Sequence, residues 1–340
     1  LADVIGTVYV LVTGSGPVTL ALIRVVAMSA ASLVTVVLAF RLLPDLTRRT
    51  AASVGDAPHI LRSGSSVFAL QIAGVMSRQQ ADKLIIGIFI GPAAVTLYEI
   101  GAKLNSLVST LTGLAVSAVL PVAAEIGATG DDDTLRALFL RGTKLIGTLV
   151  APITTVLIVI AVPFIGAWFG PGYEQAALIA QLLLGSQLLL PLYQLGDQIL
   201  IGRDRFSVWV RGGLTLALFN VALSVTLVGR FGAAGVAAAT LVACLVEFPW
   251  YARVFSKEMA LPIGAWLRTA AWPVYPLLAL PAGVAALGLA LGITDTVAGL
   301  VLTAGVAVGV YWLAVLALGY SSAEREDLRS LVLRVPRGGR

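Results

Sequence analysis

Long apolar runs, bounded by Gly, Pro or charged residues, recur along this chain every 25 to 30 residues or so, roughly the length of one bilayer-crossing helix and its turn. Charged residues make up only 12% of the 340 residues and hydrophobic residues 58%, whereas soluble domains carry roughly 25% charged residues. This pattern excludes a water-soluble enzyme. We expect an all-α integral membrane protein with little chain left for a soluble domain.

The apolar runs predict nine complete membrane spans and one partial span. The partial span covers residues 1–13 and ends at a turn over 14–17. Further turns are expected at 170–172, 229–232 and 292–295. Because the chain opens inside an apolar run without an initiator Met, we expect a fragment of a longer protein. The nine complete spans are expected at 18–40, 63–90, 94–122, 144–169, 175–200, 207–228, 234–254, 269–291 and 297–319.

The basic residues predict the orientation of these spans. Of the 23 Lys and Arg residues, 18 fall in loops or tails on one side of the expected membrane, and the opposite loops contain only Arg230. Cytoplasmic loops carry the excess of Lys and Arg, so the C-terminus is expected in the cytoplasm. The net charge of +5 is therefore interpreted as a topology signal, and no nucleic-acid partner is expected.

Arginine and glutamine residues inside the expected spans are candidates for a binding site. Arg78 lies within a span and is accompanied by the amides of Gln71, Gln79 and Gln80. An ionisable group at mid-bilayer costs at least about 2.5 to 3.5 kcal/mol, so such groups face a partner or a hydrated cavity. A cavity that binds an anion would explain Arg78 and its amides, and pairing with a carboxylate is the alternative. For Arg24 the alternative is snorkelling to the interface.

A second set of charges lies toward the outer turn between the spans at 63–90 and 94–122. Asp82 and Lys83 belong to the first of these spans, and Glu99 and Lys103 belong to the second. Opposite charges on adjacent hairpin helices can neutralise each other. We expect Asp82, Lys83, Glu99 and Lys103 to form structural charge pairs, with a role in transport as the alternative.

The sequence offers little material for catalysis. His59 is the only histidine, so a histidine-based metal site or triad is not expected. The acidic run 131–133 precedes a helical pattern and is interpreted as the start of a helix rather than a metal site. No Gly-x-x-x-x-Gly-Lys loop exists for ATP hydrolysis. We therefore expect a protein that is not an enzyme and needs no cofactor.

Three segments resemble a known family. Residues 82–104, DKLIIGIFIGPAAVTLYEIGAKL, closely resemble a motif of the Wzx-type polysaccharide-biosynthesis flippases, which export O-antigen and exopolysaccharide. Residues 119–125, VLPVAAE, are similar to that family's exit from the next helix, with Ala124 in place of the usual Ser. Residues 232–240, GAAGVAAAT, are similar to the glycine- and alanine-rich start of a later span.

The resemblance implies a MATE-like fold of two six-helix lobes around a central cavity. In that arrangement the chain lacks the first helices, and residues 1–62 form the end of the first lobe. Residues 63–258 form the second six-helix lobe, and 259–320 form an extra C-terminal helix pair. The remaining residues, 321–340, form a basic cytoplasmic tail.

The resemblance also implies a function. Members move an oligosaccharide linked to undecaprenyl diphosphate across the bacterial cytoplasmic (inner) membrane, which serves lipopolysaccharide and other surface polysaccharides. Alternating access of the two lobes would carry the substrate across. Arg78 and Arg24 would bind the diphosphate, and Gln71, Gln79 and Gln80 would contact sugar hydroxyls. The expected partners are the lipid-linked glycan and membrane lipids, with the polysaccharide polymerase and chain-length machinery as further candidates.

Two other functions stay open at this point. A cation-coupled multidrug or small-molecule exporter of the same superfamily would favour acidic cavity residues, which the basic Arg24 and Arg78 argue against. A membrane-embedded glycosyltransferase or polymerase would usually need a sizeable outer loop with catalytic residues. None of the expected outer loops is long enough.

The orientation can be measured with C-terminal fusions. Green fluorescent protein fused after Arg340 should fluoresce, and alkaline phosphatase fused at the same site should be inactive, because the charge distribution places this end in the cytoplasm. Active phosphatase with dark fluorescent protein would show that the predicted orientation is inverted.

Overall fold

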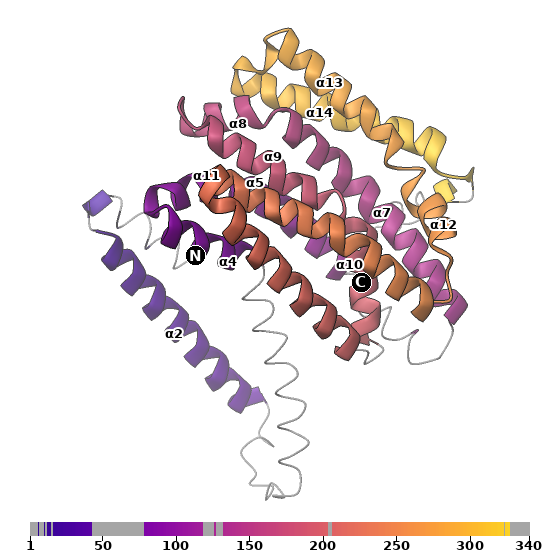
Figure 1. The fold of residues 1–340 in the computed structure, drawn as a ribbon, viewed down its shortest axis with the longest axis horizontal. Helices are drawn as coiled ribbons and strands as arrows, with labels where there is room; N and C mark the ends of the chain where they lie inside the picture. Colours follow the sequence, from indigo (N-terminus) through magenta and orange to yellow (C-terminus); the bar gives the residue numbers. More distant parts are fainter. Residues whose placement is uncertain are drawn as a thin grey trace, which may run out of the picture. The chain divides into compact units, whose positions relative to one another are not determined.

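The structure is a computed structural model that describes residues 6, 10, 12–14, 16–42, 78–117, 126, 132–202, 206–322 and 324–326. Every regular element in these ranges is a helix (Figure 1). The described part therefore agrees with the expected all-α class. The chain divides into two compact units, Leu1–Ser65 and Ser66–Arg340.

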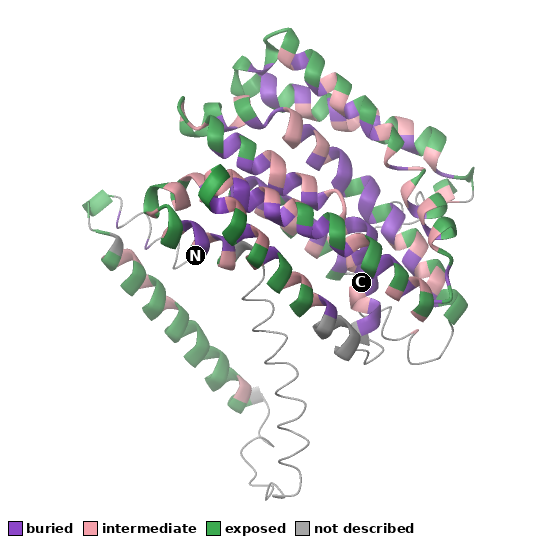
Figure 2. Cartoon of the chain, in the orientation of Figure 1, coloured by how far each residue is buried: buried purple, intermediate pink, exposed green. Residues whose placement is uncertain are grey.

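The first unit contains one long described helix, α2 (Pro17–Leu42), which begins after the turn at Gly14. Apolar side chains such as Leu22, Val26 and Leu33 are more than half exposed along its length (Figure 2). At 26 residues the helix is about 39 Å long, enough to cross the hydrocarbon core of a bilayer. An exposed apolar surface of this length is what lipid contact or packing against a further helix would cover.

The second unit is a helical bundle with a buried core (Figure 2). Its longer helices are α4 (Arg78–Phe89), α5 (Pro92–Ser117), α7 (Asp132–Val159), α8 (Ala161–Phe169), α9 (Glu174–Gln187), α10 (Leu190–Gly202), α11 (Phe206–Glu258), α13 (Ala279–Ala290) and α14 (Val297–Ala314). Its shorter elements are α12 (Ile263–Trp266), the π-helices η3 (Leu267–Ala271) and η6 (Val315–Gly319), and the 3₁₀ helices η4 (Pro276–Leu278) and η5 (Ile293–Asp295).

Helix α11 is a hairpin of two arms joined at Gly232. Gly232 has φ 60° and ψ −147°, a conformation that side-chain-bearing residues rarely adopt. The Asn220 amide lies 3.5 Å from the Thr240 hydroxyl, and the Trp250 ring lies against Gly212. In a straight helix Asn220 and Thr240 would be about 30 Å apart. The arms are therefore antiparallel, and the turn predicted at 229–232 is confirmed.

The other predicted turns are also present. The chain turns at 170–172 between α8 and α9 and at 292–295 between α13 and α14. The acidic run is likewise confirmed as a helix start, because Asp132 and Asp133 occupy the first turn of α7 and Asp133 pairs with Arg136 at 2.6 Å.

In the described residues, five helices are long and apolar enough to cross a membrane. The pair α9 and α10, bent by 51°, adds a sixth if it forms one broken span. This number is lower than the nine complete spans predicted from the sequence, for three reasons. Residues 43–77, which include most of the span expected at 63–90, lie outside the described part. Helix α5 is too polar to be counted as an apolar span. Helix α11 is counted once although its two arms correspond to two of the expected spans. The five helices are Val18–Arg41, Asp132–Val159, Gly212–Glu258, Ile263–Ala290 and Val297–Gly319.

An aromatic cluster in the main core joins helices that are far apart in sequence. Phe139 of α7 lies 4.3 Å from the ring of Phe255 of α11 and 5.2 Å from that of Trp266 of α12, measured between ring centroids. All three side chains are fully buried. Offset and edge-on aromatic pairs of this kind contribute about 0.5 to 1.5 kcal/mol each beyond burial.

The closest approach of α5 to α9 yields a test of the packing. A Cβ atom on Gly101 would lie 2.6 Å from the Ala176 carbonyl oxygen, whereas one on Gly113 of the same helix would contact nothing within 4 Å. Gly101→Ala should lower the free energy of unfolding by about 1 to 3 kcal/mol, because α9 must move away.

The matched control is Gly113→Ala, which should be neutral or stabilising by up to about 1 kcal/mol through helix propensity. Thermal unfolding of both variants in detergent measures the difference. Equal midpoints would contradict the close packing of α5 and α9.

Candidate functional site

Asp82 lies buried where α4 contacts α5 and α11. Its side chain is only 1% exposed. One carboxylate oxygen, Oδ2, accepts a hydrogen bond from the Tyr98 hydroxyl at 2.6 Å and another from the Thr240 hydroxyl at 3.0 Å. Hydrogen bonds to a charged group are about twice as strong as neutral ones. The carboxylate therefore connects α4 to α5 and to the second arm of α11.

The hydrogen bonds continue from Asp82 into the first arm of α11. The Thr240 hydroxyl accepts from the Asn220 amide at 3.5 Å, and the Asn220 side-chain oxygen accepts from Ser224 at 3.1 Å. All of these side chains are buried. We refer to the set as the Asp82 network, and its members are Asp82, Tyr98, Thr240, Asn220 and Ser224.

An ion pair lies beside this network, closer to the surface of the bundle. The Lys83 ammonium is 2.5 Å from a Glu99 carboxylate oxygen, and the two side chains are 24% and 37% exposed. Because successive helical residues point about 100° apart, Lys83 leaves α4 in a different direction from Asp82. Helix α4 thus presents one charge to the core and one to the rim, and both contact α5.

Polar residues form a line along the outer face of α5. They recur at intervals of three, four or seven residues, which places them on one helical face. All are exposed or half-buried, whereas Tyr98, Leu104 and Val108 on the opposite face are buried. We refer to this line as the polar stripe, and its members are Thr96, Glu99, Lys103, Ser106, Thr110 and Ser117.

Lys103 lies near the middle of α5. It is exposed and follows the turn residue Gly91 by twelve residues, which corresponds to about 18 Å along the helix axis. Lys103 thus lies about three helical turns from the Gly91 turn, near which it was expected from the sequence. The pair that Glu99 makes is with Lys83 on α4. If α5 crosses the bilayer, a charge at this depth requires water or a polar partner beside it.

The structure describes only some of the other candidate residues predicted from the sequence. Gln80 lies exposed in the first turn of α4. The side chains of Arg78 and Gln79 and all of Gln71 lie outside the described residues. Arg24 is exposed on α2, two turns from the helix start. The structure thus brings together Asp82, Lys83 and Glu99.

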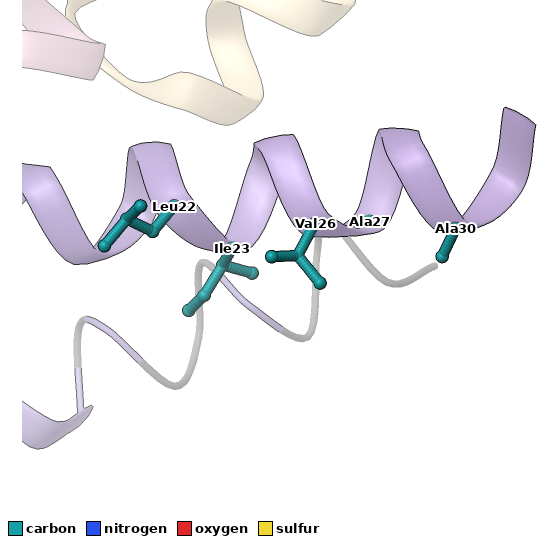
Figure 3. Close-up of a pocket in the computed structure, with 5 residues that line it drawn as sticks. All are labelled: Leu22, Ile23, Val26, Ala27 and Ala30. Carbon is teal, nitrogen blue, oxygen red and sulfur yellow. The ribbon is translucent and has the colours of Figure 1, made fainter.

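A hollow on α2 is lined by apolar side chains, unlike the polar surface of α4 and α5. It is lined by Leu22, Ile23, Val26, Ala27 and Ala30, and Figure 3 shows these side chains along the helix. No polar side chain is among them. An apolar surface of this kind suits acyl chains or another helix and offers no group to recognise a sugar or a phosphate.

Metal-binding chemistry has little material here. Among the residues that the structure describes, no group of three or more His, Cys, Asp or Glu side chains could hold a metal ion. The Asp82 network instead contains one carboxylate, three hydroxyls and one amide.

Three members of the Asp82 network were not predicted from the sequence. Asn220, Ser224 and Thr240 lie inside apolar runs and were not singled out. A signal existed, because Asn220 and Ser224 are four residues apart and share a helical face. Their pairing with Asp82 depends on a contact across 158 residues, from Asp82 to Thr240, which no local pattern contains.

Comparisons with known proteins add independent information. The family model described as polysaccharide biosynthesis protein matches residues 1–178. A curated relative, named probable flippase AglR, of Haloferax volcanii, is 25% identical over 170 residues. That alignment covers 49% of this chain and 36% of the relative, so the chain matches little more than a third of that protein's length. No solved structure matches the chain.

The Asp82 network can be tested by a double-mutant cycle. Asp82→Ala should lower the free energy of unfolding by about 2 to 4 kcal/mol, because the buried Tyr98 and Thr240 hydroxyls lose their acceptor. Tyr98→Phe should cost less in the Asp82→Ala background than in the native protein, with a coupling of about 1 to 3 kcal/mol. Unfolding monitored by circular dichroism measures the four proteins, and strictly additive effects would refute the pairing.

Proposed function

Because the chain belongs to the polysaccharide biosynthesis protein family, we propose that it forms part of a flippase that moves a lipid-linked oligosaccharide across the cytoplasmic membrane. The observation that carries this proposal is the polar stripe of α5 with Lys103 near its middle. A long membrane helix with a charged and hydroxyl-bearing outer face needs a hydrated surface to face.

The polar stripe forms one wall of the path for the glycan. Sugars present many hydroxyl groups, and Ser and Thr side chains both donate and accept hydrogen bonds. The hydroxyls of Ser106, Thr110 and Ser117 donate to carbonyls of their own helix, so their oxygen atoms keep lone pairs for a passing sugar hydroxyl. Lys103 adds a positive charge in the same line.

Arginine and glutamine side chains complete the site in this proposal. Arg78 and Arg24 bind the diphosphate, since a guanidinium group pairs with phosphate oxygens through two hydrogen bonds. Gln71, Gln79 and Gln80 contact sugar hydroxyls. The Asp82 network and the Lys83–Glu99 pair hold α4, which begins at Arg78, against α5.

The proposal extends to the whole protein. It has the Wzx-type, MATE-like arrangement of two lobes, in which this chain supplies nine complete spans and part of a tenth. It is placed in a bacterial inner membrane with the C-terminus in the cytoplasm, transports without catalysing a covalent step, and delivers O-antigen or a related glycan to the polymerase.

The alternative is a cation-coupled exporter of small molecules from the same superfamily. Cationic drugs favour a cavity lined by carboxylates. The only described carboxylate in the polar stripe is Glu99, and Lys83 neutralises it. The charge of the stripe is therefore set by Lys103, which favours an anionic substrate.

A transport experiment tests the proposal. Deletion of the full-length gene should cause lipid-linked repeat units to accumulate on the cytoplasmic side of the membrane. In the complemented strain, Arg78→Ala and Lys103→Ala should each lower export about tenfold or more, because the first removes a charge-assisted contact to the diphosphate and the second removes the positive charge of the polar stripe. Extraction of the lipid-linked units and quantification of surface polysaccharide measure both.

The matched control is Arg230→Ala, which removes an exposed arginine from a short turn and should leave export unchanged. Export that is unchanged in Arg78→Ala would remove the role of that residue. A deletion strain that retains drugs and accumulates no lipid-linked units would overturn the proposal in favour of the small-molecule exporter.

A further inference from the structure

A second aromatic cluster lies where α8 ends and the chain turns into α9. The Trp168 ring lies 5.5 Å from that of Phe164 and 6.1 Å from that of Phe169, measured between ring centroids. The Phe169 ring in turn lies 6.0 Å from that of Tyr173. In contrast to the buried cluster around Trp266, Trp168 is 65% exposed and Phe169 is 39% exposed. The end of α8 thus presents two aromatic side chains to its surroundings.

The Trp168 and Phe169 rings are nearly parallel and are followed by a hydrogen-bonded turn. Their planes are inclined by only 21°. The Gly170 N–H donates to the Gly166 carbonyl at 2.9 Å. Gly170 and Gly172 have φ values of 89° and 97°, which side-chain-bearing residues rarely adopt, so the tight turn depends on these glycines. We refer to the Trp168 and Phe169 side chains as the aromatic platform.

Hydrogen-bonding groups follow the aromatic platform directly in the chain. Glu174 and Gln175 belong to the first turn of α9, and both are exposed. The Gly172 N–H donates to the Glu174 carboxylate at 3.3 Å, which holds this carboxylate at the turn. A carboxylate accepts hydrogen bonds, and an amide both donates and accepts them. The two side chains can therefore bond to neighbouring hydroxyl groups of one ligand.

The turn beside the platform carries negative charge. The sequence contains no Lys or Arg between Lys144 and Arg203, and the charge that follows the turn is that of Glu174. Helix α8 also contacts η5, in which Asp295 is exposed. Anionic phospholipid headgroups are attracted by Lys and Arg, and carboxylates repel them. The charges at this turn therefore disfavour an anionic headgroup as the ligand of the platform.

A sugar ring has the chemistry that this surface offers. A pyranose ring carries C–H groups on its faces and hydroxyl groups around its edge. The faces of aromatic rings are electron-rich and attract the partly positive C–H groups. Polar side chains beside the rings bind the hydroxyl groups. Trp168 provides the first kind of contact, and Glu174 and Gln175 provide the second.

We propose that the aromatic platform, together with Glu174 and Gln175, binds a sugar ring of the glycan on the outer side of the membrane. This inference rests on the proposed function and on the orientation that the basic residues predict, in which the turn at 170–172 faces outward. The platform lies on α8 and is separate from the polar stripe on α5. It holds the glycan after translocation and so opposes its return to the transport path.

The experiment uses the full-length protein in nanodiscs of phosphatidylcholine. The probe is the oligosaccharide that mild acid releases from the lipid-linked units of the deletion strain, and saturation-transfer difference NMR measures its dissociation constant. Trp168→Ala should raise this constant about fivefold or more, because the stacking surface is lost. Trp168→Tyr keeps an aromatic ring and should retain most of the affinity.

The matched control is Trp272→Ala, which removes a tryptophan that is 72% exposed near the expected cytoplasmic end of the Ile263–Ala290 span. It should bind the oligosaccharide like the native protein. Thermal unfolding checks that each variant is folded. Equal dissociation constants for Trp168→Ala and the native protein would overturn the platform alone. Equal constants together with quenching of the Trp168 emission by brominated lipid would identify a membrane anchor instead. A deletion strain without lipid-linked units would overturn the proposed function and the platform with it.

Discussion

The arrangement around α4 depends on one buried carboxylate. Asp82 costs free energy to bury, and the hydroxyls of Tyr98 and Thr240 compensate that cost through bonds to the same oxygen atom. Because these donors come from α5 and from the second arm of α11, these two bonds form only when the three segments are assembled.

Helix α4 is held to the bundle by its inner face, so its other side can contribute polar groups to the surface. The Lys83–Glu99 pair at the rim and the polar stripe of α5 belong to the same two-helix surface. The two helices thus separate a structural side, where each charge is satisfied inside the bundle, from an outer side that carries Lys103. In the function proposed above, the cargo meets the polar groups of the outer side while the inner side holds the two helices together.

The sequence predicted those features that depend on residues close together in the chain. The turn at 229–232, the acidic start of α7 and the helical class all follow from residues that are near each other in the chain. It did not predict contacts between residues that are far apart in the chain. The pairing of Asp82 with Thr240 and of Lys144 with Glu324 joins residues more than 150 positions apart, and Lys144 carried no hint of a partner beyond the last span. The polar stripe could have been found from its three- and four-residue spacing, but its exposure required the packing of α5 against α9.

The hairpin at Gly232 has a consequence for the biogenesis of the protein. The turn between the two arms of α11 is so short that no hydrophilic loop separates them. The buried polar side chains of Asn220 and Thr240 face each other between the arms. A translocation channel that released the first arm alone would place the Asn220 amide in hydrocarbon without its neighbour. The arms are therefore best accommodated when they leave the channel together as one pair.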